Sequence, residues 1–237
     1  MPIEMFKERK KVINELSKKQ EQEMADDLAG GIPVGEYLDC YDTPEKRRWM
    51  DKYVEGIFKD IIPIKNSYIV DKALCIYAGE YPGDKYGEKA ENKILQMYNF
   101  GVRHFIDLTE EGELVPYDSL LPSDCTHTRF PIRDVDIPRS TDDVHKLIAH
   151  ILELSRRERG SVYIHCWGGV GRTGTIVACL YAYLMKNEGL SNDKAYELAM
   201  KKLRDSFTMC PKSKYRTTPE TKAQCAFIRR FVENECK

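Results

Sequence analysis

VYIHCWGGVGRTGT, residues Val162–Thr175, is the stretch of sequence that decides the fold. Its apolar start predicts a buried strand, and its end favours a helix. The three glycines before the arginine allow successive backbone N–H groups to point at one centre, and the start of the helix adds a positive partial charge. The stretch therefore predicts a strand, a loop that binds a tetrahedral anion, and a helix.

Two side chains in this stretch indicate chemistry on a phosphoryl group. Cys166 stands at the end of the strand, where the donors of the loop favour the thiolate over the thiol. Arg172 offers a planar, two-pronged grip on phosphate oxygens. We expect the sulfur to attack phosphorus while the guanidinium holds the transferred group. The residues expected to bind the substrate phosphate are Trp167, Gly168, Gly169, Val170, Gly171 and Arg172.

The pattern His165-Cys166-x-x-Gly169-x-Gly171-Arg172-Thr173-Gly174 closely resembles the signature loop of the cysteine-dependent protein tyrosine phosphatase superfamily. The surrounding chain, from near Ser67 to the C-terminus, looks most like the small atypical dual-specificity branch of that superfamily. The alternative without a catalytic function is a buried cysteine beside a glycine-rich turn. So many positions match at once that the resemblance is the better interpretation.

The resemblance implies further site residues. Asp134, followed by Pro138, resembles the general-acid loop of the family, with Asp136 as the alternative acid. His165 matches the residue that orders the loop, and Thr173 matches the hydroxyl that bonds the cysteine sulfur. Gln224 matches a glutamine that positions the hydrolytic water, although a purely structural helix start explains that residue equally well.

Strand and helix patterns alternate from Ser67 onward. This alternation, with spacers of crossover length, predicts an α/β fold with a mostly parallel central sheet flanked by helices on both faces, as in protein tyrosine phosphatases. A site at the carboxyl end of a central strand is where such sheets bind ligands. Besides the strand in the quoted stretch, the expected strands cover 67–70, 73–78, 102–108 and 126–131, and the expected helices cover 86–100, a segment opened by Ser140, 172–187, 192–204 and 218–234.

The chain is expected to have two parts, a helical extension at 1–62 and a catalytic domain at 63–237. A helix over 1–28 carries only a thin apolar stripe, and a second helix capped by Thr43 has a wider apolar face around Trp49. We expect the second helix to pack on the domain that follows.

Composition limits the partners and the compartment. A net charge of −1 gives no reason to expect binding to nucleic acid or to a membrane. The eight cysteines include no Cys-x2-Cys pair, so reduced thiols are the simpler interpretation and no metal or other cofactor is expected. No signal peptide or membrane span is evident, which predicts a cytoplasmic protein.

These patterns predict a protein phosphatase that acts on phosphotyrosine through a phosphocysteine intermediate, with phosphoserine and phosphothreonine left open as further substrates. Its expected partner is a phosphoprotein substrate. Alternatives on the same loop are phosphoinositide, inositol-polyphosphate and RNA 5′-phosphate phosphatases. A different class, a non-catalytic scaffold that only binds phosphate, would not require the cysteine thiol.

Overall fold

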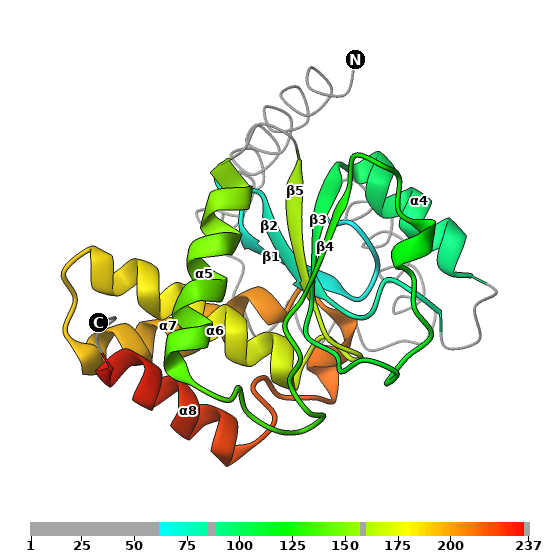
Figure 1. The fold of residues 1–237 in the computed structure, drawn as a ribbon. Helices are drawn as coiled ribbons and strands as arrows, with labels where there is room; N and C mark the ends of the chain where they lie inside the picture. Colours follow the sequence, from blue (N-terminus) through cyan, green and yellow to red (C-terminus); the bar gives the residue numbers. More distant parts are fainter. Residues whose placement is uncertain (1–61, 85–88, 157–159, 235–237) are drawn as a thin grey trace, which may run out of the picture. The chain divides into compact units, whose positions relative to one another are not determined.

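The structure is a computed structural model that describes residues 62–84, 89–156 and 160–234 (Figure 1). All of these residues belong to one compact unit, Ile62–Lys237. The two helices predicted within 1–62 lie outside the described residues.

Five strands form one sheet in the order β1-β2-β5-β3-β4. β1 and β2 are antiparallel, whereas the other three neighbouring pairs are parallel, so the predicted mostly parallel sheet is confirmed. β5 lies at the centre between β2 and β3, which places its carboxyl end where such sheets bind ligands. The strands are β1 (Ser67–Asp71), β2 (Ile76–Gly79), β3 (Val102–Asp107), β4 (Thr126–Arg129) and β5 (Ser161–His165).

The helices follow the predicted order. Gly101 ends α4 with a left-handed φ of 111°, and the Ser140 hydroxyl accepts a hydrogen bond from the N–H of Asp143 at the start of α5. The last helix begins at Lys222 rather than at the predicted 218, because Thr221 and Gln224 form a capping box there. The helices are α4 (Ala90–Phe100), α5 (Thr141–Arg156), α6 (Gly171–Asn187), α7 (Asn192–Phe207) and α8 (Lys222–Glu233), with short 3-10 turns η1 (Asp118–Leu120) and η2 (Pro211–Lys214).

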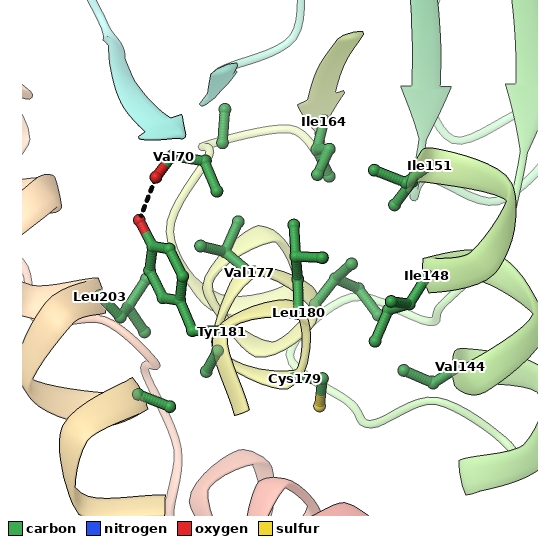
Figure 2. Close-up of a cluster of buried hydrophobic side chains, with 14 of the residues drawn as sticks. Val70, Val144, Ile148, Ile151, Ile164, Val177, Cys179, Leu180, Tyr181 and Leu203 are labelled. Atoms are coloured by element: carbon green, nitrogen blue, oxygen red, sulfur yellow. Dashed lines mark hydrogen bonds between the residues drawn. The ribbon is translucent and has the colours of Figure 1, made fainter. Parts of the chain in front are cut away.

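The two faces of the sheet bury different side chains. On one face, aliphatic strand residues such as Ile164 join a core built by α5 to α8 (Figure 2). There the Tyr181 hydroxyl of α6 donates to the carbonyl oxygen of Val70 at 2.8 Å. On the other face, Tyr77 of β2 stacks edge-on against Phe100 of α4. Successive side chains of a strand point to opposite faces, and both faces here carry apolar side chains. Helices therefore cover both faces of the sheet, as predicted.

Candidate active site

The predicted phosphate-binding loop comprises the five residues between β5 and α6, and the N-terminus of α6 follows it directly. Within the loop, Gly169 has a φ of +74°, and a Cβ there would lie 2.3 Å from the carbonyl carbon of Gly79 at the end of β2. Only glycine fits this position, because the loop crosses so close to the neighbouring strand. Cys166, the first residue of the loop, is 3% exposed.

Arg172, in the first turn of α6, is buried and brings three segments together. Its two terminal nitrogens donate to the two carboxylate oxygens of Glu113, each at 2.7 Å. Nη1 also donates to the carbonyl oxygen of Ile132 at 3.0 Å, and Nη2 lies 2.9 Å from Oδ1 of Asp134. The arginine therefore joins the phosphate-binding loop to the loop that carries the predicted acid.

The charges around Arg172 favour its ionised form. Burial opposes that charge, but the hydrogen bonds to Glu113 and the negative charges of Cys166, Glu113 and Asp134 outweigh burial and raise the pKa of Arg172. Burial likewise opposes ionisation of Glu113, and the hydrogen bonds from Arg172 outweigh it and lower the Glu113 pKa. The pair is therefore a charged, bidentate contact.

The N–H donors of the Arg172 guanidinium determine how it can hold a phosphate. A guanidinium has five N–H groups. Glu113 and Ile132 occupy both donors of Nη1 and one donor of Nη2, and Nη2 also forms an ion pair with Oδ1 of Asp134 at 2.9 Å. The Nε donor has no acceptor among the described residues. The Nε donor and the Nη2 donor shared with Asp134 are thus the two available to a phosphate.

The two aspartates of the predicted acid loop, Asp134 and Asp136, have different contacts. The Asp134 carboxylate is 55% exposed and contacts Arg172. Asp136, in contrast, accepts the N–H of Ile137 on its own side chain, and its carbonyl accepts from Nε2 of Gln224. Asp134 therefore lies beside Arg172 and Asp136 holds the turn, while the general-acid role of Asp134 stays a prediction.

His165 is fully buried at the end of β5. Its Nε2 lies 2.6 Å from the hydroxyl of Tyr117, and its Nδ1 lies 3.4 Å from the carbonyl oxygen of Cys166. Burial raises the pKa of Tyr117, so its hydroxyl stays protonated and donates to Nε2. Nδ1 then carries the imidazole proton and donates toward the carbonyl oxygen of Cys166, while the role of His165 in ordering the loop stays a prediction.

The buried imidazole makes stability depend on pH. Burial lowers the pKa of His165 to about 4. The charge of Asp107 opposes this shift, whereas His127 and Arg129 add to it. Since the pKa in the unfolded chain is about 6.5, the unfolded state binds more protons between these values. The contribution of neutral His165 to the free energy of unfolding is therefore complete above about pH 6.5 and is lost as the pH falls toward 4.

We therefore expect the protein to be less stable at about pH 5 than at about pH 7, with His165 contributing about 2 kcal/mol of the difference. Urea unfolding at the two pH values measures it. Asp107 stays ionised throughout this window, because hydrogen bonds from His127 and Thr109 outweigh its burial and lower its pKa. The His165→Gln variant should show a smaller pH dependence, and an unchanged dependence would contradict the assignment.

Three other predicted site residues have distinct surroundings. Trp167 is half exposed at the edge of the loop. The Thr173 hydroxyl is buried and has no hydrogen-bond partner among the described residues, so the bond to the cysteine sulfur is not formed in the structure. Gln224 is fully buried: its Oε1 accepts from the N–H groups of Glu220 and Thr221, and its Nε2 donates to Asp136. Gln224 thus builds the helix start, and a water-positioning role stays a prediction.

Sequence reasoning missed Glu113, Asp107 and Tyr117. Glu113 lies 59 residues from Arg172 along the chain, and Tyr117 lies 48 residues from His165. Each is a single side chain in a loop or at a strand end, where no periodic pattern marks it. The only sequence signal for Glu113 is the acidic turn that follows Leu108-Thr109.

Replacing Glu113 by Gln should lower kcat/KM for an aryl phosphate by about 10–100-fold, because the Arg172 fork loses its charged partner and its fixed orientation. Steady-state kinetics on purified protein measures this. The control is Glu111→Gln, an exposed carboxylate in the same turn. Equal rates for both variants would show that Glu113 does not orient the arginine.

Comparison with known proteins agrees with this geometry. A family model described as the Swiss Army Knife protein, DSP-PTPase phosphatase domain (PTP-SAK), matches residues 86–228. The chain belongs to this family. The matched range contains the phosphate-binding loop and the acid loop.

Two viral relatives carry the name of tyrosine phosphatases. The protein 067L of Invertebrate iridescent virus 3 is 30% identical over 122 residues, which cover 48% of this chain and 44% of that protein. The protein 197R of Invertebrate iridescent virus 6 is 29% identical over 148 residues, covering 60% and 47%. The chain thus matches less than half the length of each of these relatives.

Solved structures share the fold. The crystal structure of Tk-PTP in the active form has a TM-score of 0.55 at 23% identity and covers 72% of this chain and 98% of its own. Kinase associated phosphatase, solved with its catalytic site cysteine replaced by serine, has a TM-score of 0.53 at 18% identity and covers 71% and 93%. The sheet and its flanking helices are therefore those of protein tyrosine phosphatases. No helix among the described residues is long and apolar enough to cross a membrane.

Proposed function

We propose that this protein is a cysteine-dependent protein phosphatase that hydrolyses phosphotyrosine, and also phosphoserine or phosphothreonine, in phosphoprotein substrates. The observation that carries the proposal is the contact between Arg172 of the phosphate-binding loop and Asp134 of the acid loop, 2.9 Å apart beside Cys166. This contact, at the carboxyl end of the central strand, supports the roles of nucleophile, clamp and proton donor for Cys166, Arg172 and Asp134. The tyrosine phosphatase names of the viral relatives support the same reaction.

The first step transfers the phosphoryl group to sulfur. A phosphate dianion takes the Nε and Nη2 donors of Arg172, and it displaces Asp134 from Nη2. The displaced Asp134 carboxyl group is then available to the leaving oxygen of the substrate. The Cys166 thiolate forms a bond to phosphorus while the bond to the leaving oxygen breaks, and Asp134 gives that oxygen its proton.

The second step returns the enzyme to its starting form. The Asp134 carboxylate takes a proton from water, whose oxygen attacks the phosphorus of phosphocysteine. The sulfur leaves as a thiolate, and inorganic phosphate is released. The buried Thr173 hydroxyl, which lacks a partner in the structure, is available to donate to that departing sulfur.

A substrate panel tests the proposal. We expect turnover of a generic aryl phosphate and the highest kcat/KM for phosphotyrosine peptides among phosphopeptides, phosphoinositides, inositol polyphosphates and 5′-phosphorylated RNA. A higher kcat/KM for one of the other classes would reassign the substrate. Absence of turnover with every substrate would favour the phosphate-binding scaffold instead.

The proposal includes the domain plan and the compartment. We take residues 63–237 as the catalytic domain and 1–62 as a helical extension, which is consistent with the family match at 86–228. The thiolate mechanism requires a reduced Cys166, which favours the cytoplasm over an oxidising compartment.

A further inference from the structure

The carbonyl groups of the phosphate-binding loop are held on its outer side by other parts of the chain. In a trans peptide unit the C=O and the following N–H point in opposite directions, so each carbonyl held outward turns the next N–H inward, toward the anion. Three such carbonyls have partners from outside the loop: Trp167 O accepts from the N–H of Tyr81 at 3.0 Å, Gly168 O from Nζ of Lys212 at 2.9 Å, and Val170 O from the hydroxyl of Thr218 at 2.8 Å.

Among these three partners, only Lys212 is charged, and the peptide unit it holds is the least restrained. That unit joins Gly168 to Gly169, so no Cβ on either side limits its rotation. Without a partner on the carbonyl, the N–H of Gly169 is free to turn away from the anion. A tether is therefore needed most at this peptide.

Lys212 is itself anchored to the sheet. Its Nζ, on η2, also contacts the carboxylate of Glu80 at 3.0 Å, directly after β2. Lys93 of α4 lies 3.0 Å from the other carboxylate oxygen, Oε1, and Nδ2 of Asn66 donates to Oε2, the oxygen that Lys212 contacts, at 2.8 Å. Both Lys212 and Glu80 are more than four-fifths buried, at 17% and 18% side-chain exposure. The result is a partly buried ionic network behind the loop.

The network favours the ionised form of the Glu80 carboxylate beside Lys212. Burial opposes ionisation of Glu80, but the charges and hydrogen bonds of Lys93 and Lys212 outweigh burial and lower its pKa. Glu80 therefore compensates the positive charge of Lys212. Because the charge of Lys212 is balanced, its contribution to the loop is the directed hydrogen bond that it donates to the carbonyl oxygen of Gly168.

We propose that Lys212, anchored by Glu80, is a positioning residue that fixes the Gly168–Gly169 peptide so that the N–H of Gly169 faces the bound oxyanion. This role rests on the proposed phosphatase function, since it gives that N–H a phosphate or its transition state to hold. Lys212 acts from outside the loop and does not touch the substrate.

Vanadate binding, measured by titration calorimetry, tests the role without requiring turnover. We expect Lys212→Met to weaken vanadate binding by about 10–100-fold and to lower kcat/KM for a small aryl phosphate by a similar factor. Lys212→Arg, which keeps a cationic donor, should recover part of both. Lys214→Met, at an exposed lysine of the same turn, is the matched control and should leave both unchanged.

Thermal unfolding separates positioning from stability. A Lys212→Met protein that melts earlier but binds vanadate as tightly as the unsubstituted protein would overturn the proposal. If that variant does not fold, Glu80→Gln tests the same tether from its other end and should weaken vanadate binding by a smaller factor; unchanged binding would again overturn it. Failure of the proposed function is distinguishable, because the unsubstituted protein would then turn over no substrate whatever its vanadate affinity.

Discussion

Replacing Cys166 by Ser should reduce turnover of aryl and peptide phosphates on the order of 10⁶-fold, to the background rate. A hydroxyl is far less ionised than a thiol at neutral pH and is a poor nucleophile without a general base. The inward N–H groups and Arg172 remain, so the variant should still bind phosphopeptide. Steady-state kinetics and titration calorimetry measure the two quantities on the same preparation.

The control for this variant is Cys225→Ser, a change at a half-buried cysteine in α8, remote in sequence from the phosphate-binding loop. It should keep full activity. Undiminished turnover by the Cys166→Ser protein, with the control also active, would contradict covalent catalysis by this residue.

Replacing Asp134 by Asn should slow the hydrolysis of alkyl and ordinary phenyl phosphates by about 10²–10⁴-fold. Substrates whose leaving group is already a stable anion need no proton and should be spared at the first step. The measurement is kcat/KM across aryl phosphates of graded leaving-group acidity. Stability should change little, because the Asp134 carboxylate is 55% exposed and its ion pair with Arg172 is open to water.

Asp136→Asn is the matched control for the acid. Asp136 accepts a hydrogen bond from the N–H of Ile137 and lies in the turn. The decrease in kcat/KM for Asp136→Asn should therefore be smaller and independent of the leaving group. A steepened leaving-group dependence for Asp136→Asn, with a flat one for Asp134→Asn, would reverse the assignment.

The parts of the site that were predictable are local in sequence. Cys166 and Arg172 belong to one strand, loop and helix, and the apolar run and glycines of that segment predict this order of elements from local sequence alone. The strand boundaries were predicted to within a few residues for the same reason. Asp134 was found through its spacing to Pro138, which is also a local feature.

The parts that were missed depend on the topology of the chain. Glu113 reaches Arg172 and Lys212 reaches Gly168 because separate loops converge on one end of the sheet. A lone glutamate or lysine in a loop has no periodic pattern, and in a sequence it is indistinguishable from a solvated surface charge. Only the folded arrangement shows that Glu113 and Lys212 are partly buried and paired.

Direct detection of phosphocysteine tests the central claim. In the Asp134→Asn variant, an aryl phosphate with a stable anionic leaving group should form the intermediate without an acid, while its hydrolysis lacks a base. We predict that mass spectrometry of rapidly quenched protein finds one phosphoryl group on the peptide that contains Cys166. A burst of leaving group with no phosphoryl group on Cys166, or with the group on another residue, would contradict the account.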